Sequence, residues 1–187
     1  MDETRTFDVK LKKIKDRRWL PWIGKAYNGL FIIGDSFYLD KDGGWPDNDK
    51  DAQRNIIRNQ GLSSHLDDFK SRRLQSAVEK VILNKRSTTY DERADFWTSV
   101  AFHNLVQRTL PSRKKEDRPT DSDFDSGWKI ALEIIEIIKP KAVIVLGLAG
   151  KGRLGYILAN ENTSWKYNRD DFKKKLHAIT IEKKSVK

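Results

Sequence analysis

Cysteine is absent from this chain of 187 residues, and histidine occurs only three times. The absence of cysteine excludes disulfide bonds, thiolate zinc sites, cysteine-ligated iron–sulfur clusters and cysteine nucleophiles. It also fits a reducing compartment. His65, His103 and His177 are not spaced as a pair of metal ligands would be, so we expect neither a metal nor a cofactor.

Long apolar runs are missing as well. No segment approaches the roughly 20 apolar residues of a membrane-spanning helix, and residues 1–9 lack the apolar core of a secretory signal. We therefore expect a cytoplasmic protein that makes no membrane contact. Aromatic residues are plentiful, with 6 tryptophans, 8 phenylalanines and 5 tyrosines, which is enough to predict a folded core.

The common phosphate-binding loops are not found. Residues 147–152 read GLAGKG, which lacks the Gly-Lys-Ser/Thr of a P-loop and the third glycine of the dinucleotide fingerprint. Gly150 and Gly152 can still offer backbone amides to an anion, but the use of glycine in turns favours a tight strand-to-helix turn. A Gly-x-Ser-x-Gly elbow is absent too, although a Ser-His-Asp triad remains open.

Positive charge is present in excess. Lys and Arg total 37 against 27 Asp and Glu, which gives a formal net charge of +10 and a pI of about 9.7. A charge of this size points to a polyanionic partner, although a basic surface also serves solubility. Residues 10–18, KLKKIKDRR, form either an arm that contacts phosphates or a solvated helix whose following tryptophans pack on the core.

The apolar pattern predicts strands that alternate with helices. The predicted strands are apolar runs at residues 30–34, 96–106, 142–147 and 177–181. The second of these runs is broken by His103 and Asn104, where it leads into a loop. The predicted helices show apolar residues at helical spacing, at residues 66–83, 122–138 and 153–159. Thr120 or Ser122 is expected to cap the second of these helices, and Lys139-Pro140 to end it.

This alternation predicts an α/β fold, a three-layer doubly wound sandwich with a central, mainly parallel sheet. We expect residues 1–187 to form a single domain, with residues 1–25 as a basic N-terminal extension.

Polar residues gather after the predicted strands, at the edge of a parallel sheet where ligands bind. Those after the first two strands are Asp35, Ser36, Tyr38, His103, Asn104 and Gln107. Three of them have structural alternatives: Asp35 can cap the helix or turn after the strand, Asn104 can serve a buried backbone group, and Tyr38 can be a core aromatic residue. Their joint position at adjacent strand ends favours a functional site.

Three segments carry a family resemblance. Residues 30–38, LFIIGDSFY, are an apolar strand followed by glycine, an acid and a short loop. Residues 96–120, FWTSVAFHNLVQRTLPSRKKEDRPT, join a strand ending in asparagine to a basic loop that closes on Arg-Pro-Thr. Residues 137–150 read IIKPKAVIVLGLAG. In this order and spacing, the three segments resemble the uracil-DNA glycosylase superfamily.

The resemblance implies a DNA partner containing uracil or another deaminated base, which is flipped out of the DNA and cut at its N-glycosidic bond. Asp35 and Ser36 stand at the catalytic positions. Because serine carries no charge, Asp35 would stabilise the oxocarbenium-like sugar and orient the attacking water. Tyr38 stands where a pocket wall excludes a 5-methyl group, and Asn104 where the family reads the base edge with an amide.

The net charge of +10 and a cluster of cations near the expected cleft predict contact with nucleic acid, with a solvated charged loop as the alternative. The cations expected to contact or steer phosphates are Arg113, Lys114, Lys115 and Arg118.

The sequence also differs from the family pattern. It has no iron–sulfur cysteines, it has Phe37 where proline is usual, and it contains no His-Pro-Ser motif, which in the family grips the DNA and the leaving base. Two other functions stay open: a non-catalytic nucleic-acid-binding protein of the same fold, and an enzyme of this fold that acts on another nucleobase or nucleotide. Asp35 favours an enzyme, whereas Ser36 and the missing motif favour a binding protein.

Overall fold

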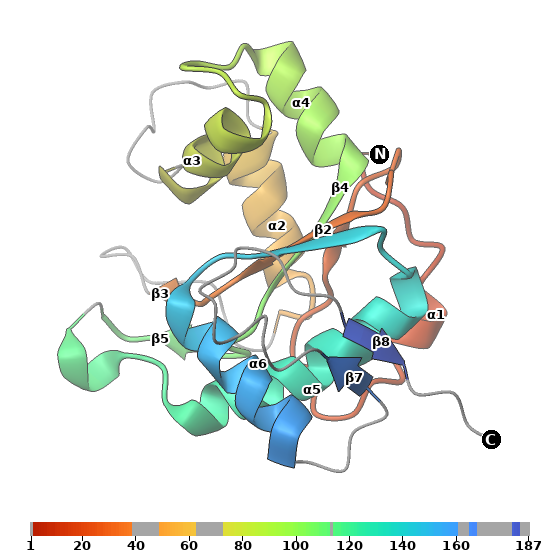
Figure 1. Cartoon of the computed structure of the whole chain (residues 1–187). Coiled ribbons are helices and arrows are strands. Elements are labelled where there is room, and N and C mark those ends of the chain that lie inside the picture. Colours follow the sequence, from red (N-terminus) through yellow and green to blue (C-terminus); the bar gives the residue numbers. More distant parts are fainter. Residues whose placement is uncertain are drawn as a thin grey trace.

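The computed structural model describes residues 2–38, 49–62, 73–112, 114–160, 165–167 and 181–183. At its centre lies a four-stranded sheet in the order β1-β4-β2-β6 (Figure 1). The strands are β1 (Trp22–Ile23), β2 (Leu30–Gly34), β4 (Val100–Asn104) and β6 (Ala142–Val145). β2 runs parallel to both β4 and β6, and β1 runs antiparallel to β4. The prediction of a mainly parallel sheet is confirmed.

Helices cover both faces of this sheet, as a mixed α/β fold requires (Figure 1). The helices on one face are α1 (Asp8–Leu11), α5 (Asp121–Ile138) and α6 (Leu148–Asn160). The helices on the other face are α2 (Ala52–Ile56), the π-helical turn η1 (Ile57–Gly61), α3 (Arg73–Ile82) and α4 (Tyr90–Ser99). None of the helices in the described ranges is both long and apolar enough to cross a membrane.

Shorter elements lie beside the main sheet. They are β3 (Phe37–Tyr38), parallel to β5 (Thr109–Leu110), the 3-10 turn η2 (Lys115–Asp117), and β7 (Trp165–Tyr167), antiparallel to β8 (Ile181–Lys183). Of the predicted strand at 177–181, only its last residue belongs to the described part of the chain, where it begins β8. The first residues of the predicted helix at 66–83 lie outside that part, which contains α3 from Arg73 onward.

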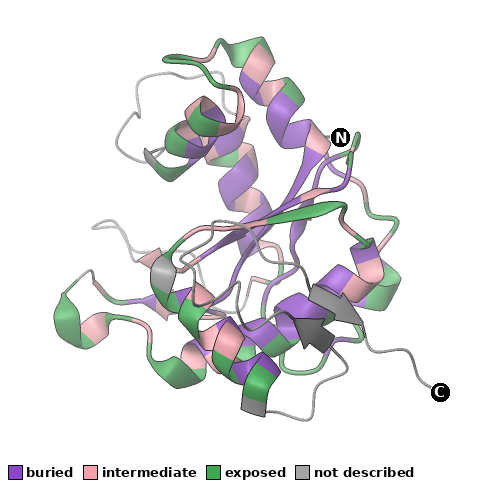
Figure 2. Ribbon diagram, in the orientation of Figure 1, coloured by how far each residue is buried: buried purple, intermediate pink, exposed green. Residues whose placement is uncertain are grey.

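The alternation of side chains along β2 divides the core into two clusters. Phe31 and Ile33 pack with α5 and α6, whereas Ile32 packs with the helices of the opposite face. Figure 2 shows the resulting band of buried residues through the sheet and along the inner sides of the helices. Burying apolar side chains on both faces stabilises the layered arrangement and leaves the strand ends as the places where polar groups emerge.

Both ends of α5 follow from local sequence. The side chain of Thr120 accepts a hydrogen bond from the backbone of Asp123, whose carboxylate accepts one from the backbone of Thr120, so the predicted Thr120 cap is confirmed. Lys139 closes the helix in a left-handed conformation. The glycine-rich segment after β6 forms the tight turn that was favoured, since Gly147 has φ of +104° and Gly150 and Gly152 are already helical.

The strand predicted at 96–106 is wrong in its first part. Residues 96–99 form the last turn of α4, and the strand begins only at Val100. Thr89 and Glu92 build a capping box that starts the helix, and the hydroxyl of Thr98 donates to the carbonyls of Ala94 and Asp95 within it. The helix continues through a run whose apolar, β-branched pattern favours a strand, and there Phe96 and Trp97 pack in the core.

The first 25 residues contribute to the core. α1 is only four residues long, but Trp19, Leu20 and Trp22 are buried, so the tryptophans that follow the basic segment pack inside the protein. Fully buried Arg54 ties this segment to α2: its guanidinium donates to Asp8 at 2.5 Å and 3.1 Å and to the carbonyl of Pro21 at 3.0 Å. These charge-assisted bonds fix the position of α2 against the sheet.

Candidate functional site

The carboxyl ends of β2, β4 and β6 lie together at one edge of the sheet. Gly34 and Asn104 are register partners, and the ladder continues one step further, with the amide of Val106 donating to the carbonyl of Asp35 at 3.0 Å. On the other side of β2, the amide of Leu146 donates to the carbonyl of Ile33 at 2.8 Å. Parallel pairing thus brings Asp35 and Asn104 to the same end of the sheet, the carboxyl end, as the sequence predicted.

Asn104 is an asparagine with an unsatisfied side chain. It is 0% exposed, and neither its Oδ1 nor its Nδ2 has a hydrogen-bond partner among the described residues. Leaving a buried polar atom unpaired costs about 1–3 kcal/mol. Gly34 makes room for this side chain, because a Cβ at Gly34 would lie 2.0 Å from Oδ1 of Asn104. The alternative in which Asn104 serves a buried backbone group finds no support in its contacts.

Two glutamine side chains hold the peptide groups of Asn104. Its N–H donates to Oε1 of Gln53 on α2 at 2.9 Å, and its carbonyl accepts from Nε2 of Gln107 at 2.8 Å. β1 pairs with β4 only at Ala101 and Phe102, so the peptide groups of Asn104 on that side of β4 have no strand partner. The two glutamine side chains pair with these groups instead. Gln53 was not among the predicted residues, since nothing in its local sequence distinguishes it.

His103 is a buried, neutral histidine whose Nδ1 has no hydrogen-bond partner among the described residues. Oε1 of Gln107 accepts from the backbone of Trp19 at 3.3 Å, so its Nε2 must donate, and it lies 3.0 Å from Nε2 of His103. This assignment makes Nε2 of His103 an acceptor and places the ring proton on Nδ1. Burial, with a smaller contribution from the charge of Arg17, lowers the pKa of His103 to about 3. His103 therefore carries no charge near neutral pH.

Asp35 is a half-buried acid without a salt-bridge partner in the described chain. Its Oδ1 is shielded from solvent and has no hydrogen-bond partner there, and burial raises the pKa of its carboxyl group. The turn at Gly147 passes beside it, since a Cβ at Gly147 would lie 3.5 Å from Oδ2 of Asp35. The segment after Asp35 forms β3 rather than a helix, so Asp35 does not cap a helix there.

The other predicted site residues lie in the segments that follow β2 and β4 in the sequence. Ser36 is partly exposed between Asp35 and β3, and Tyr38 in β3 packs against the core formed with α5. Lys114, Lys115 and Arg118 are exposed in the loop between β5 and α5. Arg113 lies outside the described residues. In the described ranges, no group of three or more His, Asp or Glu side chains is arranged to hold a metal ion.

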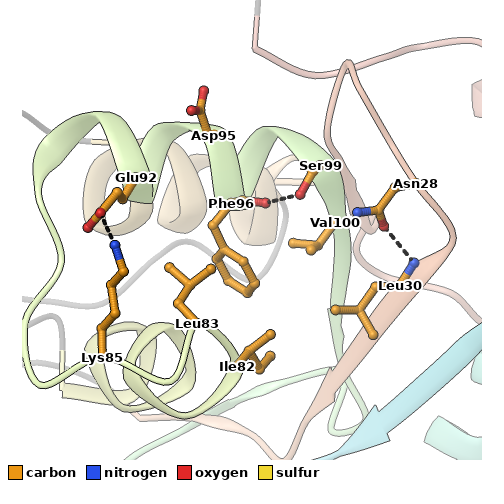
Figure 3. A pocket seen from close by; sticks show the side chains of 10 residues that line it. All are labelled: Asn28, Leu30, Ile82, Leu83, Lys85, Glu92, Asp95, Phe96, Ser99 and Val100. Atoms are coloured by element: carbon orange, nitrogen blue, oxygen red, sulfur yellow. Dashed lines mark hydrogen bonds and ion pairs between the residues drawn. The ribbon is translucent and has the colours of Figure 1, made fainter.

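A pocket of about 530 Å³ lies at the opposite, amino ends of β2 and β4 (Figure 3). Its apolar walls are the side chains of Leu30, Ile82, Leu83, Phe96 and Val100. Its polar side chains are occupied by local contacts: Lys85 pairs with Glu92, Ser99 donates to a carbonyl of α4, and Asn28 accepts from a strand amide. Asp95 points away from the apolar side chains in Figure 3. The pocket offers no convergent polar groups of the kind that orient a ligand.

Comparisons with protein-family models, with curated proteins and with solved structures found no match to this chain. The candidate site at the carboxyl ends of β2 and β4 therefore rests on the geometry of this chain alone.

Proposed function

We propose that this protein is a DNA glycosylase of the uracil-DNA glycosylase type, which hydrolyses the N-glycosidic bond of a deaminated base, uracil first, flipped out of DNA. One observation carries the proposal: an unpaired carboxylate and a buried amide with both polar atoms unpaired follow two neighbouring parallel strands. A base-excising site needs an anion for the sugar and an amide for the base.

Asp35 would act on the sugar. As the bond between C1′ and the base nitrogen lengthens, positive charge develops on the sugar ring and the base leaves as an anion with the bonding electrons. Water adds to C1′ and gives up a proton, and the departing base takes up a proton, so that the products are a sugar hydroxyl and a neutral base. The carboxylate of Asp35 has no cation beside it in the described structure, and it is partly shielded from water. In such surroundings its attraction for a developing cation is stronger than in bulk water. Ser36 offers a hydroxyl to the attacking water.

Asn104 would read the base. Its amide carries both donors and an acceptor, which can pair with two adjacent atoms on the edge of a pyrimidine. Tyr38 would form the wall beside C5. The exposed cations Lys114, Lys115 and Arg118 would bind the phosphates on either side of the flipped nucleotide.

The test is base release under single-turnover conditions. Single- and double-stranded oligonucleotides with one uracil are incubated with excess protein, and abasic sites are scored, with hypoxanthine-containing strands for comparison. We expect uracil release by the wild-type protein and its loss with Asp35→Asn. Absence of release from every substrate would reject the enzyme proposal.

A non-catalytic nucleic-acid-binding protein is the second candidate. The exposed cations of the loop between β5 and α5 favour it, because they need no catalytic acid to bind phosphates. It predicts salt-dependent DNA binding without base release, and a DNA affinity that is unchanged by Asp35→Asn. The two candidates therefore differ in one assay, base release, while both predict DNA binding.

A further inference from the structure

Gln53 carries an unpaired donor whose identity is fixed by its neighbour. A backbone N–H can only donate, so the atom of Gln53 that faces the N–H of Asn104 at 2.9 Å is the acceptor Oε1. The other end of the amide, Nε2, then has two hydrogens to donate. Gln53 is 0% exposed, and its Nε2 has no partner among the described residues.

This unpaired atom belongs to the side chain that holds the backbone of Asn104, a residue whose own side-chain amide is also unpaired. Gln53 touches Asn104 through Oε1, and its Nε2 is separated from that oxygen by a single carbon. The unpaired atoms of these two side chains are Oδ1 and Nδ2 of Asn104 and Nε2 of Gln53. Together they offer donors on two side chains and one acceptor.

The neighbouring residue on α2 is, by contrast, fully paired. Nε, Nη1 and Nη2 of Arg54 all have partners, contributed by Pro21, Asp8 and Asp51. The helix is therefore held in place one residue away from a donor that is left unused. A donor fixed in position before binding loses little freedom when a ligand arrives.

We propose that Gln53 is a second specificity-determining residue of the site, donating from Nε2 to a ring carbonyl of the base that Asn104 binds. This inference rests on the proposed function. Two donors flanking an acceptor match a ring edge that reads carbonyl, N–H, carbonyl, the imide edge of uracil. A base with an amino group in place of a carbonyl would place its own donor opposite the Nε2 donor of Gln53. A site with buried polar groups rejects such a mismatch strongly.

The test compares uracil with 2-thiouracil and 4-thiouracil, each of which replaces one carbonyl by a weak acceptor and keeps the ring N–H. Free-base affinities are measured by NMR titration of the full chain for wild type, Gln53→Met and Gln107→Met. Gln107→Met is the matched control, because Gln107 holds the carbonyl of the same asparagine but uses its Nε2 to do so. Rates of base release are measured in parallel on uracil-containing DNA.

One of the two thiouracils carries sulfur in place of the carbonyl oxygen to which Gln53 donates. We expect the wild-type protein to prefer uracil over that thiouracil by roughly tenfold, about the effect of one hydrogen bond. Gln53→Met should abolish that preference, whereas Gln107→Met should weaken all three bases alike and keep it. Such coupling between one side chain and one ligand atom does not arise from a general structural role. In the wild-type protein the side-chain amide resonances of Gln53 should also shift on binding, a readout that does not depend on the variant folding.

Two results would overturn the inference, and they are distinguishable. Base release by the wild-type protein together with an unchanged preference in Gln53→Met removes Gln53 from recognition and leaves the proposed function standing. Neither base release nor base binding by the wild-type protein removes the proposed function itself, and the role of Gln53 with it.

Discussion

The two ends of the parallel sheet differ in whether their polar side chains have hydrogen-bond partners. At the amino ends of β2 and β4 there is an apolar pocket of about 530 Å³ whose polar side chains are engaged in local contacts or point away. At the carboxyl ends the unpaired atoms of Asp35, Asn104 and Gln53 are shielded from solvent. Empty volume marks a place where a ligand fits, but unsatisfied hydrogen-bonding groups mark a place where binding releases free energy. We therefore propose that the functional site lies at the carboxyl end.

The largest expected effect separates turnover from binding at Asp35. Asp35→Asn should lower the single-turnover rate of uracil release by about 10²–10³, because it removes a preorganised charge that acts on the transition state. DNA affinity should stay within a few-fold, as measured by fluorescence anisotropy. Ser36→Ala, beside it, removes no charge and should be milder. A turnover equal to wild type in Asp35→Asn would remove Asp35 from the mechanism.

The next effect concerns the salt dependence of DNA binding. Replacing Lys114, Lys115 and Arg118 by alanine should lower the slope of log affinity against log salt by about 0.9 for each duplex phosphate that these cations neutralise. Lys25→Ala is the control, since Lys25 is exposed beside the start of β4, at the other end of the sheet. Equal slopes for the triple variant and wild type would show that this loop does not bind the DNA backbone.

Adding one methyl group at Gly34 should disturb the candidate site and the fold together. The new Cβ would lie 2.0 Å from Oδ1 of Asn104, so the amide must move. We expect a loss of about 1–3 kcal/mol in unfolding free energy, measured with urea, together with weaker discrimination between bases. Gly152→Ala in α6 has open space around it and should instead gain about 0.5–1 kcal/mol. A neutral Gly34→Ala would show that Asn104 is loosely held.

Two acids should show opposite dependences of stability on pH. Burial raises the pKa of Asp35, so its contribution to stability is present below the unfolded pKa and is lost as pH rises through the folded value. Asp35→Asn should therefore raise the melting temperature near neutral pH. The gain should be small, about 2 °C, because solvent screens a carboxylate that is only half-buried. It should disappear in acid.

Asp8 is the contrasting case. Burial opposes ionisation there, but hydrogen bonds and charge from Arg54 lower its pKa overall. The contribution of Asp8 to folding stability is present above its unfolded pKa and is lost as pH falls through its folded pKa. Asp8→Asn should therefore lower the melting temperature near neutral pH. A thermal unfolding series between about pH 3 and about pH 7 checks both signs. The same direction of change in both variants would contradict these assignments.

Most of the sheet could be predicted from sequence, because continuous apolar runs such as residues 30–34 and 142–145 carry their own signal. The start of β4 could not, since α4 continues through the first residues of the apolar run and packs them in the core. At the site, Asp35 and Asn104 were predicted because Asp35 directly follows one strand and Asn104 ends the next. Gln53 was not, because its role depends on a contact across 51 positions of sequence that the buried Arg54 network stabilises.

The central claim is that a base binds at the carboxyl ends of the parallel strands. Titrating ¹⁵N-labelled protein with uracil and mapping the amide shifts tests this most directly. We predict that the largest shifts fall on Gly34, Asp35 and Asn104 and on the side-chain amide of Gln53. Shifts confined to Leu83, Phe96 and Ser99 around the apolar pocket would contradict the claim and move the site to the other end of the sheet.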